Sequence, residues 1–232
     1  MKFEIHKDSI VQPSFRVDEV MQNFDIKAEH LNETFTGEIP IENQNWKIGL
    51  IVGGSGTGKS TIAKHLFKDA YINGFDYDDR AVLDNVSADK STHEIELAFT
   101  SVGFSSPPQW LKPYNVLSTG EKMRVDLARA LLSDKDLIVF DEFTSVVDRE
   151  VAKTCCQTIS KAIRRKDKQF IAVSCHKDII DYLNPDWIYD TDLKSFFGEG
   201  ATQSPQNEQL KYTELADLIS KKYGEYLGDI TI

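Results

Sequence analysis

The sequence contains no run of the roughly 18–20 uncharged apolar residues that a membrane-spanning helix needs. Its first residues, MKFEIHKDSI, lack the apolar stretch of a signal peptide. Its only cysteines, Cys155, Cys156 and Cys175, have neither metal-ligand spacing nor the even number of a disulfide framework. There is also no internal repeat, heptad run or low-complexity tract. We therefore expect a soluble protein of the cytoplasm, without direct membrane insertion.

Positive charge is scarce as well, because the 232 residues carry a net charge of −10. This balance argues against nonspecific binding of nucleic acid by the whole surface, although a local basic patch is compatible with it. We expect the one dense basic cluster to be a solvated helix end, where cations stabilise the helix dipole, with a contact to nucleic acid or a partner as the alternative. The cluster comprises Lys161, Arg164, Arg165, Lys166 and Lys168.

Short apolar runs alternate with helical stripes along the chain. Residues 48–52, 137–140 and 170–173 predict buried strands, and residues 60–70, 121–132 and 151–163 predict amphipathic helices. This alternation is typical of an α/β domain with a mostly parallel sheet flanked by helices. We expect Trp187 to be a packing anchor and Cys175 to be a buried structural thiol.

The composition divides the chain into three segments. Residues 1–45 are mixed and polar, with one short helical stripe at 17–24, and we expect them to pack on the core. Residues 46–192 carry the predicted strands and helices of the core domain. Residues 193–232 read as a polar linker followed by an amphipathic helix over 212–227.

A glycine-rich segment directly follows the first buried strand. Its sequence fits GxxxxGK[ST], a loop whose backbone N–H groups cradle phosphates at a helix N-terminus. Lys59 is placed to reach the β- and γ-phosphates, and the Ser60 hydroxyl is placed to bind Mg²⁺. The residues predicted to bind nucleotide here are Gly53, Gly54, Ser55, Gly56, Thr57, Gly58, Lys59, Ser60 and Thr61.

Two acidic residues follow the strand at 137–140. Asp141 emerges at the carboxyl end of that strand, where ligands bind in open α/β sheets, and we expect it to hold Mg²⁺. Glu142 comes next and is placed to polarise an attacking water. Beside a phosphate-binding loop, these two carboxylates indicate a nucleotide-hydrolysing site.

Residues 117–121, LSTGE, precede a helix that reads KMRVDLARAL. This segment resembles the signature motif of ABC-type ATPases, LSGGQ followed by a helix ending in ARAL. In that reading Ser118, Thr119 and Gly120 form a second anion cradle at a helix N-terminus. A serine N-cap with Glu121 in a capping box describes the same residues locally, and the two interpretations are compatible.

Two further segments extend the resemblance over residues 53–176, about half of the chain. Residues 145–148, SVVD, resemble the D-loop of the family, and His176 follows a buried strand where the family has its switch histidine. The resemblance implies a head-to-tail homodimer with two ATP molecules and Mg²⁺ at the interface. Lys59, Glu142 and His176 of one chain would act on ATP, with Asp148 and the signature motif completing the nucleotide site.

The sequence departs from the family pattern at several positions. Only 59 residues separate Lys59 from Ser118, so we expect a trimmed helical subdomain carrying the signature motif. No glutamine fits the Q-loop, since Gln109 is too near the signature, and the acidic segment 76–79 is our candidate for that position. The adenine-stacking aromatic is unassigned: Phe24 and Phe35 are candidates, and core packing is the simpler role for both.

A narrower resemblance concerns residues 103–110, 141–149 and 174–180. They look like a soluble, non-transporter group of ABC-type ATPases, some of which carry a fused acetyltransferase-like domain. We expect any such domain to be a separate partner chain here. The resulting hypothesis is an ATPase whose dimerisation drives a partner protein or a process on nucleic acid. The alternatives are the ATPase subunit of a membrane transporter and an ATP-gated interaction module with little turnover.

Overall fold

The computed structural model describes residues 1–8, 11–27, 32–42 and 44–198. Its centre is a five-stranded sheet in the order β4-β5-β3-β6-β7. The contacts β4–β5, β5–β3 and β3–β6 are parallel, and β7 is antiparallel to β6. The strands are β3 (Ile48–Val52), β4 (Leu137–Phe140), β5 (Gln169–Ser174), β6 (Trp187–Asp190) and β7 (Ser195–Gly198).

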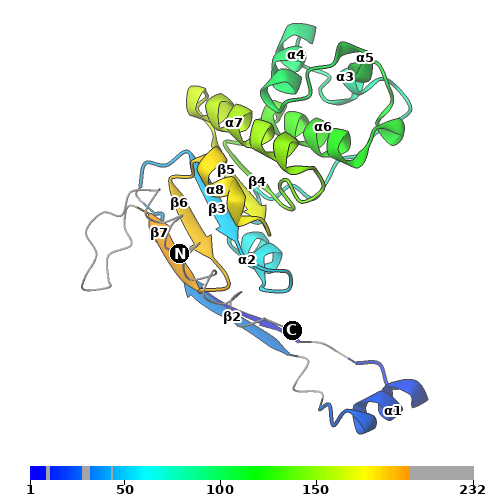
Figure 1. Ribbon diagram of the computed structural model, residues 1–232, viewed down its shortest axis with the longest axis vertical. Helices are drawn as coiled ribbons and strands as arrows, with labels where there is room; N and C mark the ends of the chain where they lie inside the picture. The colour runs from blue at the N-terminus through cyan, green and yellow to red at the C-terminus, as the bar shows by residue number, and fades with distance from the viewer. Residues whose placement is uncertain (9–10, 28–31, 43, 199–232) are drawn as a thin grey trace.

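Helices cover both faces of this sheet (Figure 1). On one face, α2 packs with Ile51, Val139 and Ile171; on the other, α6, α7 and α8 pack with alternate strand residues such as Leu50 and Ile138. The parallel strands are therefore apolar on both sides, as buried parallel sheets are. The helices on the two faces are α2 (Lys59–Leu66), α6 (Thr119–Leu132), α7 (Arg149–Arg165) and the short α8 (Ile180–Leu183), which follows a 3₁₀ turn, η3 (Lys177–Ile179).

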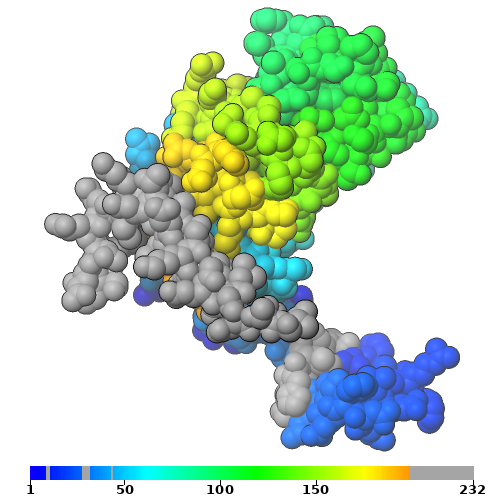
Figure 2. Space-filling view, in the orientation of Figure 1, coloured from blue at the N-terminus to red at the C-terminus, as the bar shows by residue number. Residues whose placement is uncertain are grey.

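The segment between α2 and β4 forms a helical arm, which we define as residues 82–132. Figures 1 and 2 show this arm as a lobe at one end of the molecule. Ser91 and Ser118 begin α4 and α6 with capping boxes, in which each serine side chain accepts from the N–H three residues on. The arm contains α3 (Val82–Asn85), α4 (Thr92–Ser101), α5 (Pro107–Trp110), η2 (Tyr114–Val116) and α6.

An antiparallel hairpin, β1 (Lys2–Lys7) and β2 (Glu33–Glu38), lies against the α2 side of the core. Phe3 is buried there, and Gly37 opposite it leaves room for Tyr189: a Cβ on Gly37 would lie 2.2 Å from the Tyr189 hydroxyl. The helix α1 (Phe15–Asn23) between the two strands contributes no buried residue. Thus the hairpin, and not α1, joins the first segment to the core.

The structure confirms the predicted strands at 48–52, 137–140 and 170–173, and it confirms the helix at 121–132. The predicted helix at 60–70 is shorter, because α2 ends at Leu66. Trp187 is a buried packing anchor, with its ring edge-to-face on Trp46. The helix predicted over 212–227 lies outside the described residues. Of the helices that the structure does describe, none combines the length and the apolarity required to cross a bilayer.

Three expectations about side-chain burial need correction or detail. Cys175 is exposed, because it lies one residue beyond β5 where the chain turns out of the sheet, whereas Cys155 and Cys156 are buried on α7. Phe24 is exposed as well and is no core residue. In the basic cluster, Lys161, Arg164, Arg165 and Lys166 are exposed, as expected for a solvated helix end, and Arg164 also forms an ion pair with Asp186.

Candidate functional site

The phosphate loop, residues 53–60, connects β3 to α2. Its backbone requires glycine at Gly58, which has φ of 89° and begins α2 as the N-cap residue. A Cβ on Gly58 would lie 2.4 Å from the ring of Phe35, so close packing excludes a side chain there as well. The loop therefore has the glycine-dependent, N–H-rich geometry that suits anion binding at a helix N-terminus.

The side chain of Lys59 folds over this loop. Its Nζ donates a hydrogen bond of 2.6 Å to the backbone oxygen of Gly54, and the residue is only 8% exposed. The lysine is thus held at the centre of the curve that the loop makes. A phosphate chain entering the loop would meet an ammonium group that is already held beside the loop backbone.

A pocket of about 320 Å³ opens beside the loop. It brings together Lys59, Ser60 and Glu142, which the sequence places in two segments more than 80 residues apart. The hairpin supplies a further wall with Lys7, Glu33 and Phe35, none of which the phosphate-binding motif predicts. The remaining lining residues are Ser55, Gly56, Gly58 and Thr61.

The turn after β4 aims Glu142 outward. Glu142 and Thr144 both adopt left-handed backbone conformations, with φ of 52° and 66°, which non-glycine residues rarely occupy. Thr144 is completely buried, and its hydroxyl has no hydrogen-bond partner among the described residues. Such strain concentrates at functional sites, and here its result is an exposed carboxylate at the pocket.

Asp141 precedes this turn and is held by two donors. Its Oδ1 accepts a 2.9 Å hydrogen bond from the N–H of Glu142, and its Oδ2 accepts one from the Tyr71 hydroxyl. Burial raises the pKa of Tyr71, and the hydrogen bond to Asp141 raises it further. The tyrosine is therefore a neutral donor that fixes the rotamer of Asp141.

Asp141 and Ser60 offer the oxygen ligands that suit Mg²⁺. Mg²⁺ commonly uses one or two protein oxygens together with phosphate oxygens and waters. No group of three or more His, Cys, Asp or Glu able to hold a metal occurs within residues 1–8, 11–27, 32–42 and 44–198. The donor types fit an ion shared with a phosphate chain, but Asp141 is not among the described residues that line the pocket, so the Mg²⁺ site stays a prediction.

Two residues that follow β6, Thr191 and Asp192, form hydrogen bonds with the phosphate loop. Thr191 Oγ1 lies 2.6 Å from Thr57 Oγ1, and Asp192 Oδ1 accepts a 2.9 Å hydrogen bond from the N–H of Gly54. These partners are 134 and 138 residues apart in the sequence, so no local signal predicted them. They hold the first half of the loop against the sheet.

His176 follows β5 at the start of the η3 turn and is half-buried. Its N–H donates to Ser174 Oγ at 3.2 Å. The residue does not belong to the described lining of the pocket beside the phosphate loop. It lies at the carboxyl end of a strand neighbouring β3, on the same edge of the sheet as the loop.

The signature segment begins α6. Ser118 Oγ accepts from the Glu121 N–H at 3.4 Å, and Glu121 Oε2 accepts from the Ser118 N–H at 2.8 Å, so the capping-box interpretation is confirmed. Hydrogen bonds from Ser118 lower the pKa of Glu121. None of Ser118, Thr119 and Gly120 belongs to the phosphate-loop pocket described above.

The D-loop segment packs on the signature segment. A Cβ on Gly120 would lie 2.8 Å from Val147 Cγ1, so glycine permits this close approach. Asp148 caps α7, with Oδ1 accepting from the Val151 N–H at 3.0 Å. Residues 118–120 and 145–148 thus form one continuous surface of the chain.

The acidic segment 76–79 lies against α6. Arg129 donates to the backbone oxygen of Asp76 at 2.8 Å, and the Tyr77 hydroxyl donates to Asp126 at 2.8 Å. The stacked ring of Tyr114 supplies a second hydroxyl to the same carboxylate. None of residues 76–79 is among the described residues that line the phosphate-loop pocket.

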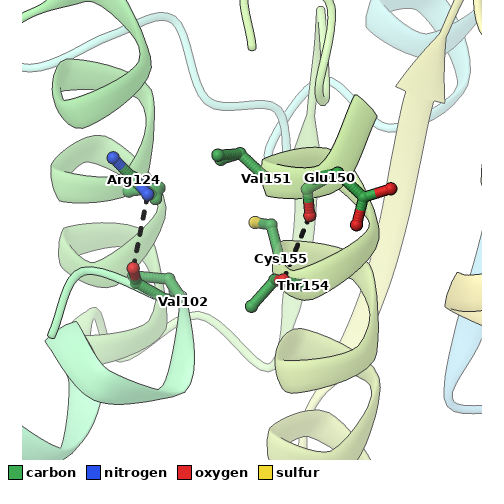
Figure 3. Close-up of a pocket in the computed structure, with 7 residues that line it drawn as sticks. Val102, Arg124, Glu150, Val151, Thr154 and Cys155 are labelled. Atoms are coloured by element: carbon green, nitrogen blue, oxygen red, sulfur yellow. Dashed lines mark hydrogen bonds between the residues drawn. The ribbon is translucent and has the colours of Figure 1, made fainter. Parts of the chain in front are cut away.

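A second pocket, of about 190 Å³, lies between α6 and α7 (Figure 3). Arg124 lies at one side and donates to the Gly103 oxygen at 3.3 Å, while Val151, Thr154 and Cys155 line the α7 side. Burial raises the pKa of Cys155 to about 12. No predicted site residue lines this pocket, so it is separate from the nucleotide site.

Comparison with protein families agrees with these motifs. A sequence model described as ABC transporter matches residues 69–145, about a third of the chain. The match begins after the phosphate loop and includes the signature segment, Asp141 and Glu142. The loop at 53–60 therefore adds evidence from outside the matched region.

The chain is also similar to parts of longer curated proteins. It is 25% identical over 204 residues to the Lactococcin-G-processing and transport ATP-binding protein LagD of Lactococcus lactis subsp. lactis, covering 68% of this chain and 29% of that protein. It is 31% identical over 162 residues to the mRNA export factor elf1 of Schizosaccharomyces pombe, and the similarity covers 57% of this chain and 15% of that protein. It thus spans less than a third of either protein.

Solved structures show the same fold. A bacterial Atm1-family ABC exporter with ATP bound has a TM-score of 0.57 at 20% identity, covering 78% of this chain and 37% of that one. A dimeric bacterial ABC transporter cassette has a TM-score of 0.53 at 17% identity, and the match covers 68% of this chain and 87% of that one. The fold is that of an ABC-type P-loop NTPase, as predicted.

Proposed function

We propose that this ABC-type ATP-binding domain binds ATP with Mg²⁺ and hydrolyses it in a head-to-tail homodimer. The observation that carries the proposal is the pocket shared by Lys59, Ser60 and Glu142. An ammonium, a hydroxyl and an exposed carboxylate line one space, and these are the groups that phosphate binding, Mg²⁺ binding and water activation would use.

Within one chain, different residues bind the phosphates, hold Mg²⁺ and activate water. Backbone N–H groups of the phosphate loop and the ammonium of Lys59 bind the β- and γ-phosphates. Ser60 and Asp141 hold Mg²⁺, which when bound neutralises phosphate charge. Glu142 orients a water and accepts its proton, and His176 contacts the γ-phosphate. The ring of Phe35, which packs on Gly58 and lines the pocket, is the aromatic side chain available to stack on the adenine base of ATP.

The second chain supplies the other wall of the site. Ser118, Thr119 and Gly120 at the start of α6, with Asp148 of the neighbouring loop, would meet the γ-phosphate bound to the partner chain. Two observations support this: the segments form one surface, and similar cassettes have been solved as dimers, one of them in a post-hydrolysis state bound to ADP and Pi.

The process that hydrolysis drives has two candidates. The sequence motifs favour an ATPase that acts with a separate acetyltransferase-like protein or on nucleic acid, with the acidic segment 76–79 in the Q-loop position. A membrane transporter subunit is favoured by the family match and by the transport role that the name of LagD gives. Affinity purification of the tagged chain with ATP, followed by mass spectrometry, separates the two, because a transporter subunit would retain a membrane protein.

Phosphate release by the purified chain tests the activity. The wild-type chain should release phosphate from ATP only with Mg²⁺, and Lys59→Ala should reduce the rate by ~10²-fold or more, since a preorganised charge on the phosphates is lost. Lys68→Ala, which changes an exposed lysine just beyond the same helix and outside the pocket, is the control. Equal rates for Lys59→Ala and the wild type would refute the assignment of the phosphate loop.

A further inference from the structure

The turn after β5 carries two opposite charges directly after His176. Lys177 and Asp178 point to different parts of the molecule, and each makes an ion pair there. His176 is therefore followed by a backbone segment that is anchored on two sides. One anchor leads to the phosphate loop, and the other leads to the D-loop segment, residues 145–148.

The first anchor connects the turn to the phosphate loop. Lys177 Nζ lies 2.7 Å from Oδ2 of the fully buried Asp190 and 3.0 Å from Oδ2 of Asp192. The other oxygen of Asp192 accepts the hydrogen bond from the N–H of Gly54. One carboxylate thus joins the residue after His176 to the backbone of the phosphate loop.

The second anchor connects the turn to the D-loop segment. Asp178 accepts two hydrogen bonds from Arg149, of 2.8 Å from Nε and 2.6 Å from Nη2, in the bidentate geometry that fixes both side chains. Arg149 is the first residue of α7 and directly follows Asp148. Its Nη1 is buried without a hydrogen-bond partner among the described residues, so the guanidinium is held in place by Asp178.

We infer that Lys177 and Asp178 are positioning residues, which set the imidazole of His176 relative to the phosphate loop and the D-loop segment. The inference rests on the proposed function, in which His176 contacts the γ-phosphate. Partly exposed ion pairs such as Arg149–Asp178 contribute little to folding stability. The expected effect of breaking this pair is therefore on turnover and on His176, with folding largely unchanged.

The test compares single variants with a charge exchange. Asp178→Asn and Arg149→Gln should each lower kcat by roughly tenfold to a hundredfold, the cost of misplacing a reacting group, with KM for ATP within about twofold of the wild type. The double variant Arg149→Asp/Asp178→Arg restores an opposite pair and should recover most of kcat. Asp192→Asn tests the other anchor, because it keeps an acceptor for Gly54 but removes the charge that faces Lys177.

Arg164→Gln is the matched control. Arg164 pairs with Asp186 at 3.0 Å, and its side chain is 36% exposed, against 40% for Arg149, yet it lies at the far end of α7. This control should retain wild-type kcat and melting temperature. A kcat in Asp178→Asn and Arg149→Gln equal to that of the control, or no recovery in the exchanged pair, would overturn the inference.

A second measurement is independent of turnover. The ring signal of His176, assigned by its loss in His176→Gln, should shift in NMR spectra when a non-hydrolysable ATP analogue and Mg²⁺ are added. The shift should shrink or broaden in Asp178→Asn while the analogue still binds. If the analogue shifts the His176 signal equally in Asp178→Asn and in the wild type, the positioning role is refuted, even for a chain that hydrolyses no ATP. If the wild-type chain shows the shift and Asp178→Asn reduces it, but no ATP is hydrolysed, only the proposed activity is refuted.

Discussion

The hydroxyl of Tyr71 donates a hydrogen bond to Oδ2 of Asp141, across 70 residues of sequence. Tyr71 also forms an isolated parallel bridge with Val139 of β4, so its backbone is fixed to the strand that directly precedes Asp141. The aspartate therefore enters the site with its side chain already oriented. This relationship gives the first prediction.

Tyr71→Phe should lower the affinity for Mg²⁺ in ATP binding, so that a higher Mg²⁺ concentration is needed, while the fold stays intact. Loss of a partner that orients a metal ligand commonly costs about 10–100-fold in metal affinity. The measurement is titration of a fluorescent ATP analogue with free Mg²⁺. Tyr114→Phe removes a similar hydrogen bond to Asp126 in the helical arm, and its Mg²⁺ dependence should match the wild type. Identical Mg²⁺ titrations for both variants would show that Tyr71 does not act through Asp141.

Glu142→Gln should trap ATP and promote dimerisation. The substitution keeps the size of the side chain but removes its basicity, and loss of a general base typically lowers the rate by ~10²–10⁴-fold. Light scattering should show a dimer with ATP and a monomer with ADP. Adding Ser118→Arg should abolish the dimer, because a bulky cation would fill the anion cradle at the start of α6. A monomer at saturating ATP would contradict the composite site.

Gly58→Ala should destabilise the chain and abolish nucleotide binding. Alanine at φ of 89° costs about 1–2 kcal/mol in the left-handed region, and its Cβ would also collide with Phe35. Gly74→Ala is the matched control, since Gly74 has φ of 99° and no atom within 4 Å of the added Cβ. In urea denaturation, the free energy of unfolding should be lower for Gly58→Ala than for Gly74→Ala. Equal unfolding free energies would mean that Phe35 moves aside without cost.

Cys175 should be the only thiol that reacts with iodoacetamide in the folded chain at pH 8. It is exposed, whereas burial raises the pKa of Cys155 to about 12 and that of Cys156 still higher. A raised pKa leaves almost no thiolate at pH 8, and the thiolate is the reactive form. Mass spectrometry should therefore find one added group natively and three in urea. Cys175→Ser should take up none natively, and labelling of Cys155 would contradict the packing of α7.

The sequence predicted β3, β4 and β5 because a strand that is buried on both faces is a continuous apolar run. It did not predict β1 and β2, in which polar and apolar residues alternate over only six residues each. The phosphate loop, Asp141 and Glu142 were recognisable because each follows such a run directly. The phosphate loop and Glu142 line one pocket, whereas Asp141 is not among its described lining residues, and the individual roles stay predictions.

Other parts of the site depend on contacts that a sequence does not display. Asp192 holds the N–H of Gly54 from 138 residues away, and no spacing rule connects them. Tyr71 lies in a polar segment with no motif of its own. Cys175 was wrongly predicted to be buried because the apolar run at 170–173 gives no sign of where the chain leaves the sheet; that happens just after Ser174.

The register of the β1–β2 hairpin has a consequence for how such a pocket can change. Ile5 lies opposite Phe35, and Lys7 lies opposite Glu33, so the wall beside the phosphate loop is made of successive layers, one apolar and one charged. Residues two apart in a strand share a face. A substitution in the charged layer would leave the contact between Phe35 and Gly58 in place, whereas a substitution at Phe35 would also act on the phosphate loop. Under the proposed function, the charged layer is the part of this wall in which ligand selectivity could evolve without a change in the phosphate loop.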